Sequence, residues 1–235
     1  MTTAELTPVE PAIRKRKSSK IPITYIVALV PVAIALNFLG SEINGLLFLP
    51  LFLDMIGTAV VAIVLGPWWG ALVGGLTNVI AALMGGPISL PFAACNIVGA
   101  LIWGYGIRAG LGKNYFLFFV LNVLAALAVT LTAVPIYVFI FGGATGAYSD
   151  MMTAAFLAMG QNLWVSVFSS NIMVSLADKI ISGFVALAII EALPANLKAK
   201  LVLPKSSSKM GRIAWIAGAL VLGVAITLIF LALQK

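Results

Sequence analysis

The chain has 235 residues, of which 62% are hydrophobic and only 9% are charged. Several apolar runs approach the ~20 residues that a helix needs to cross a hydrocarbon layer, so a soluble domain is excluded and a multi-pass membrane protein is predicted. The net charge of +7 comes largely from basic clusters that suit cytoplasmic loops better than a nucleic-acid interface, so no nucleic-acid partner is expected.

The residue types present also exclude most chemistry. Histidine is absent and there is one cysteine, Cys95, so an internal disulfide cannot form and imidazole cannot bind a metal or move a proton. No G-x-x-x-x-G-K-[ST] loop is present to hold nucleotide phosphates. We therefore expect no catalytic residue, no metal, no cofactor and no ATPase activity by that route.

In chain order, the sequence predicts an all-α polytopic membrane bundle. A polar, basic tail over 1–20 precedes a six-helix core over 21–194, a cytoplasmic linker over 195–212 and an additional C-terminal transmembrane helix within 213–235. The predicted helices span 21–39, 46–65, 68–84, 91–109, 116–141, 169–192 and 213–233.

The stretch 49–83 predicts two helices folded back on each other. Gly66-Pro67 ends the first and starts the second, because proline lacks an N–H and suits the first position of a helix. In the second helix, small residues such as Gly70 and Gly74 recur at helical spacing, which lets neighbouring helix backbones approach closely in lipid. The first helix carries Asp54 within otherwise apolar sequence.

The placement of basic residues predicts the orientation and a long external loop. If Arg108, Lys113 and the cluster 198–212 are all cytoplasmic, an even number of crossings must separate them. The apolar region 151–191 then supplies a single crossing, preceded by a loop or short surface helix over 142–166. Loops of this length are commonly lids or binding loops. The N-terminus is predicted to be cytoplasmic and the C-terminus external, in the cell membrane.

Three charged residues lie inside predicted helices and away from their ends: Asp54, Asp178 and Lys179. Charges at this depth cost about 3 kcal/mol each on insertion scales, so they should face the bundle interior and be paired. We expect an Asp54–Lys179 pair, with a separate polar partner for Asp178, which points about 100° away from its neighbour on the helix. A structural clamp, substrate contact and ion coupling all remain possible roles.

Polar and aromatic residues near the outer helix ends are candidates for substrate binding, because amides orient a small polar ligand and aromatic faces stack on its rings. The alternative for the aromatic ones is anchoring at the headgroup level. External acids such as Glu42 favour a cationic or neutral ligand over an anionic one. The candidates are Asn44, Asn96, Tyr137, Tyr148, Asp150, Gln161, Asn162, Trp164 and Asn171.

Three motifs make the sequence resemble the substrate-binding S components of energy-coupling-factor (ECF) transporters. They are P-x-x-L-D-x-x-G-T at 50–58, L-G-P-W-W-G-A-L-V-G at 65–74, and A-D-K-I-I-S at 177–182 followed by Leu193-Pro194. The resemblance implies that the outer ends of the later helices enclose a vitamin or related micronutrient. It also implies as partners a transmembrane coupling subunit and two ATPase subunits.

The resemblance further implies that the predicted helix over 21–39 docks to the coupling subunit. Such proteins commonly use an A-x-x-x-A pair there, which this chain lacks; Ala28, Pro31 and Ala35 stand in its place.

Two other functions remain open. A proton-coupled secondary transporter could use Asp54 as its relay, although the sequence shows no inverted repeat. A membrane ligand sensor is the second alternative. An intramembrane aspartyl protease is disfavoured, because neither Asp54 nor Asp178 lies in a G-x-G-D setting and Lys179 adjoins the latter.

Overall fold

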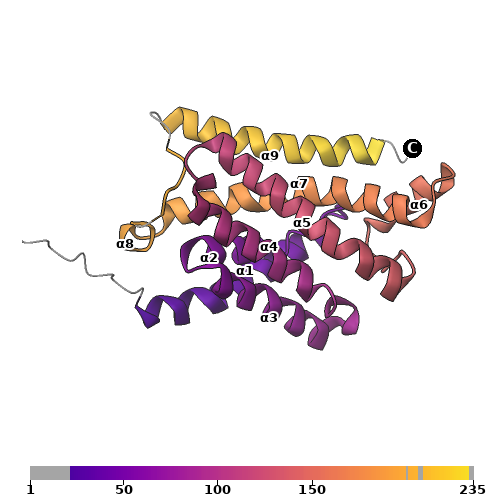
Figure 1. Cartoon of the computed structure of the whole chain (residues 1–235), viewed down its shortest axis with the longest axis horizontal. Coiled ribbons are helices and arrows are strands. Elements are labelled where there is room, and N and C mark those ends of the chain that lie inside the picture. The colour runs from indigo at the N-terminus through magenta and orange to yellow at the C-terminus, as the bar shows by residue number, and fades with distance from the viewer. Residues whose placement is uncertain (1–21, 200, 206–208, 233–235) are drawn as a thin grey trace, which may run out of the picture.

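The computed structural model describes residues 22–199, 201–205 and 209–232; the predicted tail over 1–20 lies outside these. Every regular element within them is helical, which confirms the all-α polytopic bundle (Figure 1). The elements are α1 (Ile23–Leu46), α2 (Ile56–Val64), α3 (Pro67–Gly85), η1 (Pro87–Ser89), α4 (Ala93–Gly106), η2 (Ile107–Leu111), α5 (Tyr115–Phe141), α6 (Asp150–Ala158), α7 (Leu163–Ala192), α8 (Ala195–Lys198) and α9 (Lys209–Ala232).

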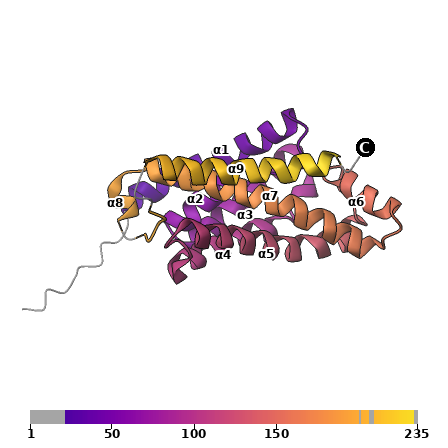
Figure 2. The ribbon, with the colours of Figure 1, turned by 90° about the horizontal axis from the view of Figure 1, so that it is seen from above.

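The longer helices run side by side, with α9 on the outside against α7 and with α6 and α8 at opposite ends (Figures 1 and 2). By length and composition, α1, α3, α5 and α7 can each cross a membrane. The interior is packed with apolar side chains such as Trp103, Phe118 and Phe184, all fully buried. Close packing of α5 on α7 and of α3 on α4 joins most of the buried apolar residues into one main core, beside two smaller clusters.

The predicted helix over 46–65 was wrong in its first half. Its helical part is only α2, and residues 47–55 form an irregular segment in which Phe48 and Leu53 both have positive φ, 52° and 54°. Pro50 lacks a backbone donor for a helix, and the backbone N–H groups of Phe52 and Leu53 bond to a side chain of α7. Asp54 therefore lies in an unwound segment just before α2.

The hairpin at Gly66-Pro67 is confirmed. Gly66 has φ 134°, a conformation that favours glycine, and Pro67 is the first residue of α3. A Cβ on Gly70 would lie 2.4 Å from the Cβ of Ala62, so α3 touches α2 through a residue without a side chain. The predicted small-residue face is therefore a packing face.

The asparagine Asn37 ties α1 to both arms of this hairpin. Its Nδ2 donates to the hydroxyls of Thr58 and Thr77 at 2.8 and 3.0 Å, and its Oδ1 accepts from the Gly57 backbone N–H at 2.7 Å. A fully buried amide needs such partners, because leaving it unpaired costs about 1–3 kcal/mol.

Two predicted boundaries also differ from the structure. The loop expected after residue 39 is helical, because α1 continues to Leu46. The segment predicted as a loop or short surface helix over 142–166 does contain the short helix α6, but α7 already begins at Leu163, before the predicted start at residue 169. The Asn162 side chain accepts from the Val165 N–H at 3.0 Å and so caps α7, whose first residue lies six positions before the predicted start of that helix.

Candidate functional site

A cavity of about 450 Å³ lies between α3, α4, α5 and α7, at the end of the bundle that carries α6. Its volume is within the range of small-molecule sites. Its polar groups come from several helices, and a loop before α6 covers part of it. The residues that line it are Phe52, Asp54, Asn78, Ala81, Gly85, Gly86, Ile88, Ser89, Phe92, Cys95, Asn96, Val129, Ala133, Tyr137, Thr145, Gly146, Ala147, Asn171, Ser175 and Lys179.

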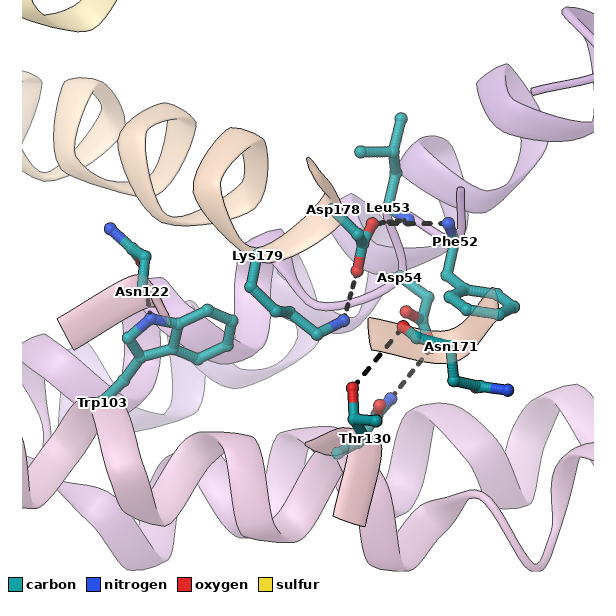
Figure 3. Close-up of polar contacts among 10 residues, drawn as sticks. Phe52, Leu53, Asp54, Trp103, Asn122, Thr130, Asn171, Asp178 and Lys179 are labelled. Carbon is teal, nitrogen blue, oxygen red and sulfur yellow. Dashed lines mark hydrogen bonds and ion pairs between the residues drawn. The ribbon is translucent and has the colours of Figure 1, made fainter. Parts of the chain in front are cut away.

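A buried ion pair borders the cavity. The Lys179 ammonium pairs with Asp178 Oδ2, and the two side chains are 2% and 0% exposed (Figure 3). The expected Asp54–Lys179 pair is therefore replaced by one between neighbours on α7. Their Cα–Cβ bonds diverge, but the flexible four-carbon stem of lysine bends back far enough to reach the adjacent carboxylate.

The other oxygen of Asp178 fixes the unwound segment before α2. Oδ1 accepts from the backbone N–H of Leu53 at 2.7 Å and from that of Phe52 at 3.3 Å. These bonds replace the helical ones that the segment lacks, and they hold Leu53 at a positive φ that is unusual for a branched side chain. The next residue, Asp54, is thereby presented to the cavity (Figure 3).

Asp54 takes its hydrogen bond from the neutral side chain of Asn96, whose Nδ2 donates to Oδ2 at 3.1 Å. Among the described residues, no lysine or arginine forms an ion pair with Asp54. Lys179 lines the same cavity. Two charged groups thus line the cavity. The Asp54 carboxylate forms no ion pair, and the Lys179 ammonium is paired with Asp178.

Amides and aromatic rings form the walls. The amide nitrogens of Asn78 and Asn171 each donate to a carbonyl one turn back, on Gly74 at 3.1 Å and on Val167 at 2.9 Å, so both side chains are fixed. Tyr137 packs against Phe92 with ring centroids 5.1 Å apart. A rigid wall with polar and aromatic groups can orient a small ring-containing compound.

The covering loop is pinned by Asp150, the first residue of α6. Its Oδ2 accepts from the backbone N–H groups of Thr145 and Gly146 at 2.6 and 2.7 Å. Gly146 has φ 88°, which a residue with a side chain would rarely adopt. Asp150 therefore shapes the cavity from outside, without lining it.

The structure brings together some of the sequence candidates and separates others. Asn96, Tyr137 and Asn171 line the cavity with Asp54 and Lys179. The remaining candidates lie outside it: Asn44 near the end of α1, Tyr148 against Phe48, Asp150 under the loop, Gln161 exposed before α7, Asn162 as the cap of α7, and Trp164 against Phe139.

Several cavity residues escaped the sequence analysis. Asn78 and Ser175 each fall in the middle of an apolar helix, where sequence alone does not tell a ligand contact from a buried amide or hydroxyl. Phe92 is one of 13 phenylalanines, so its residue type gave no signal. The cue that would have found Asn78 is its position on α3, four residues after Gly74, on the small-residue face that packs against α4.

On the outer side of α1, Ala28, Pro31 and Ala35 are exposed, spaced three and four residues apart. They form one face of the helix, as the docking prediction requires.

A polytopic helical bundle with a largely apolar cavity between its helices, lined also by several amide and charged side chains, is typical of a membrane protein that binds a small molecule. A family described as "ECF transporter, substrate-specific component" matches residues 25–190. The chain therefore belongs to the substrate-specific components of ECF transporters, whose members are substrate-binding transport subunits rather than enzymes and associate with a coupling subunit and ATPases. Comparison with curated proteins and with solved structures gave no match.

Proposed function

We propose that this chain captures a vitamin or related micronutrient at high affinity from the external side of the cell membrane, as the substrate-binding subunit of an ABC-type importer. The cavity between α3, α4, α5 and α7 is the proposed binding site. This is the observation that carries the proposal, because a cavity of about 450 Å³ with fixed amides and aromatic rings suits a compound of vitamin size.

The position of the cavity supports entry from outside. It lies at the end formed by the loop before α6 and by the connection between α3 and α4. The basic residues Arg108, Lys113 and Lys198 lie in or beside η2 and α8, at the other end of the bundle (Figure 1). Basic residues favour the cytoplasmic side, which leaves the cavity on the external side.

The energy for transport would come from the partners. The chain contains no G-x-x-x-x-G-K-[ST] loop, and the exposed Ala28, Pro31 and Ala35 on α1 offer small side chains for contact with the coupling subunit. In this arrangement two ATPase subunits drive release of the captured compound into the cell.

Uptake in reconstituted vesicles tests the proposal. Vesicles that contain the chain with a coupling subunit and two ATPases are given a defined mixture of water-soluble vitamins, and their contents are measured by mass spectrometry. When ATP is supplied to the ATPase subunits, we expect one compound to accumulate in the vesicles. With a non-hydrolysable ATP analogue, we expect none to accumulate.

Vesicles that contain the chain alone are the matched control. Accumulation there, driven by a proton gradient and abolished in Asp54→Asn, would instead identify a proton-coupled secondary transporter. That outcome would overturn the proposed importer.

A further inference from the structure

We infer that the captured compound carries one net positive charge at neutral pH, as a protonated amine or a quaternary nitrogen, and that Asp54 binds this charge. The inference rests on the proposed function, because it names the chemical class of the compound that the cavity would hold.

The charges inside the bundle do not balance. The sequence has no lysine or arginine between Lys20 and Arg108, and only Lys179 between Lys113 and Lys198. Against this one ammonium stand two carboxylates, Asp54 and Asp178. With all three groups ionised, the interior carries one excess negative charge.

The excess charge belongs to Asp54. Asp178 is paired with Lys179 and also accepts two backbone N–H bonds from the unwound segment, so its charge is compensated. Asp54 has a neutral amide as its hydrogen-bond partner and is partly open to the cavity. A carboxylate held away from water is costly unless it is paired with a cation, so the part of the cavity that Asp54 lines favours a cationic group.

The rest of the cavity suits a cation as well. Phe52, Phe92 and Tyr137 line it, and the negative faces of aromatic rings attract ammonium groups. The one basic side chain in the wall, Lys179, pairs with Asp178 and also attracts Asp54, so the three groups together keep one net negative charge. An anionic compound would meet the Asp54 carboxylate without a free positive charge to offset it.

The entrance has the same sign. Asp150 lies beneath the covering loop at the mouth of the cavity, with its carboxylate bonded to two backbone N–H groups of that loop. Negative charge at an entrance attracts cations and repels anions. The carboxylate at the covering loop therefore acts in the same sense as the one that lines the cavity.

The test uses the small molecules that the full-length purified chain retains from cells. The chain is heat-denatured, and the released compounds are separated at pH 7 by capillary electrophoresis coupled to mass spectrometry, which gives the sign of charge and the mass of each. Asp54→Asn, Asp54→Glu and the control Glu42→Gln are treated in the same way. Glu42→Gln also removes one carboxylate, but from an exposed position on α1.

We expect the unmodified chain, Asp54→Glu and Glu42→Gln to release a compound that migrates as a cation. Asp54→Asn should release about 10- to 100-fold less of it, since a charge-assisted bond is lost. A retained compound that migrates as a neutral species or an anion overturns the inference, as does full retention by Asp54→Asn, and either result leaves the proposed function standing. The sign of the charge on the retained compound is measured on the unmodified chain, so that result does not depend on any variant folding. If the unmodified chain releases nothing, the proposed tight capture fails and the inference fails with it.

Discussion

At the scale of single residues, Asp178 compensates a charge and also shapes the backbone. One of its oxygens pairs with Lys179, and the other accepts the N–H groups of Phe52 and Leu53. Its removal would leave a buried ammonium and two buried N–H groups without partners. Removal of Lys179 would leave Asp178 with both backbone donors. The two members of the pair are therefore not equivalent.

We expect Asp178→Ala to destabilise the protein by about 3–5 kcal/mol, because breaking a buried pair leaves a charge uncompensated. Lys179→Met, which keeps the volume of the stem, should cost less, since two backbone N–H groups still stabilise the Asp178 carboxylate. The measurement is the free energy of unfolding in mixed micelles by denaturing-detergent titration. A larger loss in Lys179→Met than in Asp178→Ala would contradict the double role of Asp178.

A second residue-scale prediction concerns Asn37. Asn37→Leu removes an amide that bonds to Thr58, Thr77 and the backbone N–H of Gly57, all of which are buried. We expect a loss of about 2 kcal/mol or more, because the partners stay buried without a replacement. Asn37→Asp, which keeps the acceptor for the backbone, should retain part of the stability. Equal melting temperatures for Asn37→Leu and the unmodified protein would show that the hydrogen bonds of Asn37 do not stabilise the bundle.

At the scale of elements, the helices approach one another where a side chain is missing. Gly57 of α2 lies against the backbone of α1, and Gly74 of α3 lies against Asn96 of α4. Lipid supplies no hydrophobic drive between helices, so contact area from close approach must replace it. The same approach brings Asn96 next to Asp54, so helix packing positions the cavity residues.

Gly57→Ala tests this packing. The added Cβ would lie 2.0 Å from the backbone carbonyl oxygen of Ala33, so α1 and α2 must separate, at a cost of about 1–3 kcal/mol or more. Gly45→Ala on α1 is the matched control, since a Cβ there meets no atom within 4 Å. We expect a lower melting temperature in detergent for Gly57→Ala and an unchanged or slightly higher one for Gly45→Ala. The opposite order would contradict the close contact.

At the scale of the whole molecule, the two ends of the bundle carry different polar features. One end carries the cavity, the covering loop and α6. The other carries η2, α8 and their basic residues, with Arg108 Nη1 donating to the Gly104 carbonyl at 2.6 Å. The proposed direction of transport depends on which of these ends faces the cell exterior.

Thiol labelling decides the orientation. In a Cys95→Ser background, which removes the one native and buried thiol, Trp164→Cys should react with a membrane-impermeant reagent in intact cells, because Trp164 is 45% exposed near the cavity end. Lys113→Cys should react only after the membrane is permeabilised. The reverse pattern would place the cavity on the cytoplasmic side and end the proposal of capture from outside.

Much of the fold was predictable from the sequence, because membrane burial acts on runs of residues that lie next to one another. The Gly66-Pro67 break and the small-residue face of α3 are local features, and the structure contains both; of the predicted apolar runs, four form helices long enough to cross a membrane within the described residues. The family resemblance is likewise carried by short motifs, and it was confirmed over residues 25–190. The candidate site was less predictable, since outer aromatic and amide residues anchor to headgroups as readily as they bind ligands.

The sequence by itself determined that this protein is a helical membrane bundle with two acids and one base in its interior, because composition and helix length are set by the bilayer. Only the tertiary structure decided how those charges pair. Asp178 reaches both its neighbour Lys179 and the backbone of a segment about 125 positions away, and it thereby stabilises the unwound form of that segment, in which Asp54 lines the cavity. Pairings of this kind depend on distances between segments far apart in the sequence, and the periodicity along one helix does not predict those distances.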